Sequence, residues 1–397
     1  MKVQSTRTIL FWIHLVAGTV AGLVILVMSV TGTLLTFQQS VLKIIERPQR
    51  VIVPPPGAGR LDLDTLLERV KGAIPDAQPA TVTLESDPFA TASVSLGARG
   101  VVFVNPYSGE VLGTGSPRAR AFYRAVTNWH RWLAVEGEGR ATARAVTGAG
   151  NAAFLVLAVT GLFLWWPRQW TVRHLAPVLL IRRGLRGKAR DFNWHNAIGF
   201  WCAPVLIVLT ASGMVISYTW ASNLVYTLTG SPRPAAASGR PTSEARTSRR
   251  PADTNAIAQR ATLASLQASA EERVPTWRTM IVRLAANNAP IAFSMSDRAH
   301  WNGFARSTLT LDPRTGAEIR WEPYANTSLG QKARGWLRFA HTGELGGVPG
   351  EAIAGLASAG GGFLVWTGLS LALRRFAAWW LRRRSSRAEE TPNARVA

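Results

Sequence analysis

The sequence is nearly free of cysteine and short of acidic residues. Its only cysteine, Cys202, leaves no partner for a disulfide within the chain and excludes a Cys-x-x-Cys-His site for covalent attachment of a cofactor. Lysine and arginine number 45 against 23 aspartates and glutamates, which gives a formal net charge of +22. Much of the basic excess lies in two short segments, residues 167–191 and 374–397, where membrane topology explains it without a nucleic-acid partner.

Charged residues are also missing from four long stretches. No Asp, Glu, Lys or Arg occurs between Arg7 and Lys43, between Arg144 and Arg168, between Asp191 and Arg233, or between Glu351 and Arg374. Each stretch exceeds the roughly 20 apolar residues that cross a hydrocarbon core. We therefore predict four transmembrane helices, at residues 9–37, 144–166, 192–222 and 351–373. We expect the first helix to be retained, because its apolar run is too long for a signal peptide and no small-x-small cleavage pattern closes it.

The two basic segments predict how the chain is oriented. Positively charged loops stay on the cytoplasmic side of a membrane, so both segments and both termini are expected in the cytoplasm. Residues 38–120 and 253–334 have the composition of soluble domains and are then exported. The segments 121–143 and 335–350, which precede spans two and four, are expected at the outer face. The sequence thus predicts a multi-pass protein surrounded by the lipid of the inner membrane.

The two exported domains resemble each other. Each combines a helical stretch with two alternating apolar runs separated by an Asx-Pro pair and a glycine. The turns are Asn105-Pro106-Tyr107-Ser108-Gly109 and Asp312-Pro313-Arg314-Thr315-Gly316. Such turns are typical of β-hairpins. We predict two small α+β domains and, at residues 230–252, a flexible linker rich in Pro, Ala, Ser, Gly and Arg.

The predicted spans repeat as well. Span one holds His14 and Gly32, and span three holds His195 and Gly213 at the same spacing, five turns at about 3.6 residues per turn. Spans two and four share another pattern, with a histidine ahead of the span and a glycine deep inside it. These residues are His130 with Gly161 and His341 with Gly368. The chain therefore uses the order span, exported domain, span twice.

Four of the six histidines occupy these repeat positions. With the N-terminus inside, His14 and His195 are expected near the cytoplasmic face, and His130 and His341 near the outer face. A lone histidine at a helix end often only bonds to a neighbour, but four at repeat-related positions favour ligation of a metal or cofactor. Zinc would need three or four ligands together, whereas two imidazoles on different helices suit the axial positions of one haem iron.

The glycines are expected at the level of the opposite histidine pair, where a flat macrocycle needs a surface without side chains. Gly32 and Gly213 would lie beside the outer pair, and Gly161 and Gly368 beside the inner pair. Small residues also let membrane helices pack closely, which is the simpler explanation. Arg131 and Arg338, next to the outer histidines, can pair with haem propionates or an anionic substrate, or belong to an interfacial belt.

These features together resemble a known family. The two hairpin turns, the segments His130-Arg131-Trp132-Leu133 and His341-Thr342-Gly343-Glu344-Leu345, and the span motifs are similar to those of the PepSY-associated transmembrane proteins. These are bacterial iron-regulated inner-membrane proteins that include ferric-siderophore reductases. The resemblance covers nearly the whole chain. It implies two small PepSY-like periplasmic domains and two haem b groups, with His14, His195, His130 and His341 as axial ligands.

The resemblance also implies a reaction, in which electrons cross the inner membrane and reduce ferric iron in a periplasmic siderophore. Some relatives carry a fused flavin domain, but this chain has no G-x-G-x-x-G motif after a strand. The expected electron donor is therefore a separate cytoplasmic reductase or a membrane quinol. Two alternatives stay open: a non-enzymatic, membrane-anchored PepSY binding or regulatory protein, and a cytochrome b with a different periplasmic electron acceptor.

Overall fold

The computed structural model describes residues 2–167, 169–233, 261–284, 289–300 and 302–390. The predicted linker therefore lies outside the described residues from position 234 onward. The chain divides into two compact units. A helical unit comprises Met1–Gln39, Phe122–Val225 and Ala333–Ala397, and a sheet unit comprises Ser40–Ala121 and Tyr226–Lys332.

The four predicted spans are confirmed as long helices of the helical unit. They are α1 (Lys2–Thr36), α6 (Arg140–Trp165), α8 (Gly187–Ser217) and α13 (Gly347–Glu390). Each contains a segment long and apolar enough to cross a membrane. The last helix continues well beyond the predicted end at residue 373, because Ala, Leu and Arg are strong helix formers and no Gly or Pro interrupts them.

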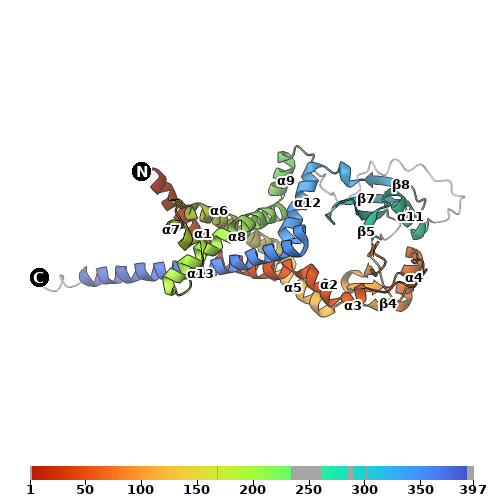
Figure 1. Ribbon diagram of the computed structural model, residues 1–397, viewed down its shortest axis with the longest axis horizontal. Helices are drawn as coiled ribbons and strands as arrows, with labels where there is room; N and C mark the ends of the chain where they lie inside the picture. Colours follow the sequence, from red (N-terminus) through yellow and green to blue (C-terminus); the bar gives the residue numbers. More distant parts are fainter. Residues whose placement is uncertain (1, 168, 234–260, 285–288, 301, 391–397) are drawn as a thin grey trace. The chain divides into compact units, whose positions relative to one another are not determined.

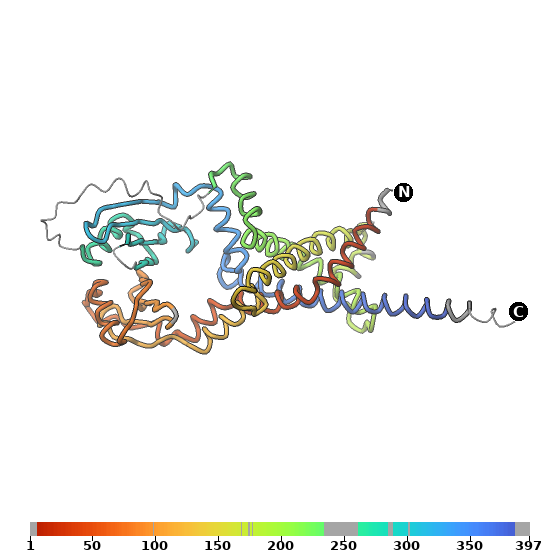
Figure 2. Tube along the Cα trace, turned by 180° about the vertical axis from the view of Figure 1, so that it is seen from behind, coloured from red at the N-terminus to blue at the C-terminus, as the bar shows by residue number. Residues whose placement is uncertain are grey.

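The spans form a closed four-helix bundle. Helix α1 packs against α6 and α13, and α8 packs against the same two helices (Figure 1). The N-terminal end of α1 and the C-terminal end of α13 lie at the same end of the helical unit (Figure 2). Three consecutive glycines of α13 permit the close approach, since Gly360 faces Cys202 of α8 and Gly361 faces Phe154 of α6.

Short helices join the spans to the rest of the chain. Helices α2 (Gln38–Ile45) and α3 (Arg47–Arg50) follow α1, α7 (Val172–Leu179) lies in the basic loop, and α9 (Thr219–Leu228) follows α8. Two helices precede the second and fourth spans: α5 (Pro117–Trp132) and α12 (Leu329–Thr342). Each of these two begins in the sheet unit and ends in the helical unit, so it connects the units covalently.

The sheet unit contains one antiparallel sheet of eight strands. The first half supplies β1 (Thr81–Glu85), β2 (Ala92–Ser95), β3 (Val101–Val104) and β4 (Val111–Gly113). The second half supplies β5 (Trp277–Arg283), β6 (Ile291–Asp297), β7 (Arg306–Leu311) and β8 (Glu318–Glu322). The strand order is β4-β3-β2-β1-β5-β6-β7-β8. The sequence predicts two small domains, whereas the structure joins them edge to edge through β1 and β5, which covers two strand edges that would otherwise be open.

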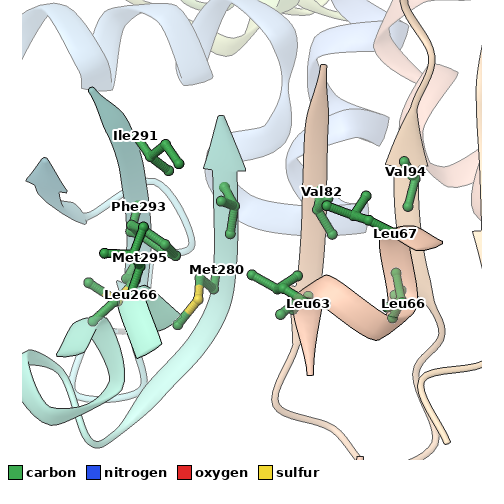
Figure 3. Close-up of a cluster of buried hydrophobic side chains, with 14 of the residues drawn as sticks. Leu63, Leu66, Leu67, Val82, Val94, Leu266, Met280, Ile291, Phe293 and Met295 are labelled. Carbon is green, nitrogen blue, oxygen red and sulfur yellow. The ribbon is translucent and has the colours of Figure 1, made fainter. Parts of the chain in front are cut away.

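One face of this sheet carries the hydrophobic core. Helices α4 (Leu63–Ala73) and α11 (Leu263–Arg273) both pack on it, as Figure 3 shows for Leu63 and Leu66 on one side and Leu266 on the other. Val82 and Val282 are direct partners across the seam and both are fully buried. The two predicted hairpins are confirmed, since β3 pairs with β4 and β7 with β8.

Candidate functional site

The helical unit brings the four repeat-related histidines together in twos. His14 of α1 and His195 of α8 have ring centres 6.2 Å apart with the rings nearly perpendicular, at 85°. We call these two residues the span pair. His130 of α5 and His341 of α12 have ring centres 6.5 Å apart at 56°, and we call them the flank pair.

The Nδ1 atom of each histidine lies within hydrogen-bonding distance of a hydroxyl group on a neighbouring span. In the span pair, His14 Nδ1 lies 2.9 Å from Thr160 Oγ1 of α6, and His195 Nδ1 lies 2.9 Å from Thr367 Oγ1 of α13. In the flank pair, His130 Nδ1 lies 2.9 Å from Thr31 Oγ1 of α1. Because Nδ1 is engaged, Nε2 is the ring nitrogen that remains for another partner.

His341 departs slightly from this pattern. Its Nδ1 donates to the backbone oxygen of Leu209 at 2.8 Å and lies 3.2 Å from Ser212 Oγ, both on α8. A carbonyl can only accept a hydrogen bond, so Nδ1 of His341 carries its hydrogen.

The predicted glycines lie directly against these imidazoles. A Cβ atom built on each glycine would approach the Cε1 atom of one histidine. The distances are 3.2 Å from Gly161 to His14, 3.3 Å from Gly368 to His195, 3.4 Å from Gly32 to His130 and 3.2 Å from Gly213 to His341. In every case the glycine follows the hydroxyl residue in the sequence. We call each such dipeptide a hydroxyl-glycine step. It supplies one hydrogen-bond partner and the room for one ring.

Positive charge gathers beside the flank pair. Partial burial lowers the pKa of Arg131, and the positive charges of Arg144 and Arg338 lower it further. Arg131 also stacks on Trp132, with the guanidinium carbon 4.6 Å from the ring centre. Among the described residues, no carboxylate forms an ion pair with any of the three arginines. The cluster therefore has unsatisfied charge to offer to an anion.

Sequence reasoning missed several residues around these pairs. It assigned a role to the glycine of each step but not to Thr31, Thr160, Ser212 or Thr367, although each hydroxyl residue directly precedes its glycine. Arg144 was also missed, because it lies far in the sequence from both histidines of the flank pair, whereas Arg131 and Arg338 lie within three residues of them.

Another missed residue is Asp191, one turn before His195 on α8. Its side chain is buried and accepts hydrogen bonds from Arg190 at 2.9 Å and from Ser370 Oγ at 2.7 Å. Arg374 lies 3.6 Å from its second oxygen. This carboxylate ties α8 to α13 near the span pair, and no sequence repeat points to it because the equivalent position of α1 is Leu10.

The residues present fit one planar metal cofactor at each pair. A metal ion held between two imidazole nitrogens, with bonds of about 2 Å and roughly 1 Å from each nitrogen to its ring centre, would place the two ring centres roughly 6 Å apart. The two observed separations, 6.2 and 6.5 Å, agree with this. Within the described ranges no three His, Cys, Asp or Glu side chains converge as a metal site, which argues against the multi-ligand sets that zinc prefers there.

Comparison with known proteins gives one result at the level of the family. A search of curated proteins found no match. The family model for the PepSY-associated TM region matches residues 11–375, a range that includes both histidine pairs, all four hydroxyl-glycine steps and both halves of the sheet. The chain is thus a multi-pass membrane protein that belongs to the PepSY-associated TM region family.

Proposed function

We propose that this protein is a dihaem b-type electron-transfer protein of the bacterial inner membrane, which reduces ferric siderophores on the periplasmic side. The observation that carries the proposal is the arrangement of the two histidine pairs, with Nδ1 engaged from behind and ring centres 6.2 and 6.5 Å apart. When bound, haem b supplies one-electron redox chemistry at each pair.

The histidines, the hydroxyl residues and the glycines have different roles in this proposal. His14 and His195 would hold one haem, and His130 and His341 the other. Thr160 and Thr367 orient the first pair, Thr31 and Ser212 the second, and the four glycines leave room beside the rings. The interior between the two levels contains a cluster of buried apolar residues that includes Leu206, Ala158 and Ala357, and this cluster would exclude water.

The two levels define a route across the membrane. His14 and Gly32 are separated by five turns of α1, roughly 27 Å at about 1.5 Å per residue, and Gly32 lies against His130. With both termini in the cytoplasm, as the basic segments favour, electrons would enter at the span pair and leave from the flank pair. The donor would be a separate cytoplasmic reductase or a membrane quinol.

The arginine cluster supports an anionic acceptor at the flank pair. Arg131, Arg144 and Arg338 can bind carboxylates of the haem or of a ferric complex. Reduction would release the iron, because the hard oxygen donors of a siderophore bind Fe(III) much better than the softer Fe(II).

A reduced-minus-oxidised visible spectrum of the purified protein, together with haem quantification, tests the proposal. Two b-type haems per chain are expected, and a colourless preparation that takes up no added haem would refute it. The acceptor is tested by mixing the reduced protein with a ferric siderophore and following haem reoxidation together with trapping of the released Fe(II). Reoxidation by oxygen alone, with no Fe(II) formed, would point instead to a cytochrome b with another acceptor.

One observation favours a binding role for the sheet unit as a second candidate function. A pocket of about 460 Å³ lies between α4 and α11, and residues from both halves of the chain line it, among them Arg60, Glu271 and Trp277. A PepSY-type binding or regulatory module would use such a pocket. Binding of a peptide by protein that contains no haem would support this function over electron transfer.

A further inference from the structure

The hydroxyl group of each step has only one hydrogen to donate, and a backbone carbonyl of its own helix lies within hydrogen-bonding distance of it. Each hydroxyl donates to the carbonyl four residues earlier on its own helix. These bonds run from Thr31 to Val27 (2.6 Å), from Thr160 to Val156 (2.7 Å), from Ser212 to Val208 (2.6 Å) and from Thr367 to Phe363 (2.8 Å). While the hydroxyl donates to its own helix, its oxygen can only accept a hydrogen bond from the facing imidazole.

This pattern favours one tautomer of each histidine. A neutral imidazole carries one hydrogen, and an Nδ1 that donates to a hydroxyl or a carbonyl must hold it. The lone pair then lies on Nε2, the ring nitrogen that is free to bind another partner. We propose that Thr31, Thr160, Ser212 and Thr367 are positioning residues that hold all four histidines in the Nδ1–H tautomer and so lower the reduction potential of the metal at each pair. The potential part rests on the proposed function, whereas the tautomer does not.

The effect on potential follows from ligand basicity. A histidine that donates Nδ1–H to an acceptor becomes a more basic ligand at Nε2, and a more basic ligand stabilises the oxidised metal. Loss of the acceptor should therefore raise the potential. A change that keeps the hydroxyl, such as Thr→Ser, should leave it nearly unchanged.

The four steps are not equivalent, which supplies internal controls. Within the described residues, Thr160 is the hydrogen-bond partner found for His14 Nδ1. His341 has the Leu209 carbonyl at 2.8 Å as its nearer partner and Ser212 at 3.2 Å as its second. Thr160→Val should thus have the largest effect, and Ser212→Ala the smallest.

The tautomer is tested without haem. Protein with ¹⁵N-labelled histidine, prepared in the haem-free form in lipid, is examined by solid-state NMR. Wild type should show the buried histidines protonated on Nδ1, Thr160→Val should shift the signal of one of them, and Thr160→Ser should restore it. Protonation on Nε2 in the wild-type protein would overturn the proposal, whether or not the protein binds haem.

The potential is tested on the loaded protein by spectroelectrochemical titration. Thr160→Val should raise the midpoint potential of one haem and leave the other unchanged, Thr160→Ser should match wild type, and Ser212→Ala should give the smaller shift. Equal haem content with unchanged potentials in Thr160→Val would overturn the tuning role. Absence of haem from every preparation would refute the proposed function instead, and the NMR result would still decide the tautomer.

Discussion

The span pair and the flank pair have similar separations between their ring centres, 6.2 and 6.5 Å, but are built from different parts of the chain. His14 and His195 lie on the membrane helices α1 and α8, and their steps lie on α6 and α13. His130 and His341 lie near the ends of the short helices α5 and α12, and their steps lie on α1 and α8. The bundle alone thus completes the span pair, whereas the flank pair needs two added helices.

The flank pair therefore depends on how the helices α5 and α12 are held where they begin. Helix α5 starts beside buried Glu46, which binds Arg120 at 2.6 Å and Arg50 at 2.9 Å. Helix α12 starts where Gly330 packs on Tyr226 and donates its N–H to Ser231 Oγ at 2.8 Å. We expect disturbances of these anchors to affect the flank pair and spare the span pair.

Removing one histidine from each pair has the largest expected effect. His14→Ala and His130→Ala should each reduce haem content from two to one per chain, because a single imidazole holds haem b much less firmly than two. Haem quantification and redox titration of each variant give the measurement. His300→Ala, in the sheet unit, is the control and should keep both haems. Loss of both haems in either variant would mean that the two pairs are not independent.

Filling the space beside a ring should have the next largest effect. Gly161→Ala places a methyl group 3.2 Å from His14 Cε1, whereas Gly18→Ala, also between α1 and α6, meets Leu157 at a comfortable 3.6 Å. Alanine favours a helix by about 1 kcal/mol over glycine, so any loss cannot come from weaker helix formation. We expect severalfold less haem at the span pair for Gly161→Ala, by titration of the purified apoprotein with haem. Equal loss in both variants would contradict the role given to Gly161.

Breaking the anchor of α5 should weaken only the flank pair. Glu46→Gln leaves Arg120 and Arg50 without their buried charge partner, which costs about 3 kcal/mol by analogy with other buried pairs. Thermal haem loss is measured in His14→Ala protein, which retains the flank pair, and in His130→Ala protein, which retains the span pair. The change should lower the midpoint temperature in the first and not in the second. Glu322→Gln, in the exposed pair with Arg320, should change neither.

Acid pH, like Glu46→Gln, should lower the temperature at which the flank pair loses haem, with a smaller effect. Burial raises the pKa of Glu46, but hydrogen bonds from Arg120, Ser116 N–H and Arg50 lower it by more, so it lies below its ordinary value of 4.5. A carboxyl whose pKa is lower in the folded state stabilises the fold above its unfolded pKa and loses that contribution as the pH falls through the folded pKa. The flank pair should therefore release haem at a lower temperature as the pH falls below 4.5, the ordinary pKa of this carboxyl, and Glu46→Gln should reduce this dependence.

Much of the site could be predicted from helical spacing and from the internal repeat of the sequence. Helical spacing relates His14 to Gly32 and His195 to Gly213, and the internal repeat relates His130 to His341, so the pairing follows from the sequence. The hydroxyl partners could not be assigned, because threonine and serine in a membrane helix usually bond only to their own backbone. The seam could not be predicted either, since Val82 and Val282 lie far apart in the sequence and each strand alone reads as the edge of a separate domain.

Each histidine pair combines residues from both halves of the chain, so neither half can form a pair alone. Each step docks a histidine of its own half, Thr160 with His14 and Ser212 with His341, but each pair takes one histidine from either half. The sheet is divided in the same way, with β1 from one half and β5 from the other. Neither half is therefore self-sufficient: each half alone would carry one histidine of each pair and an open strand edge. A second half of matching shape would complete both pairs and the sheet.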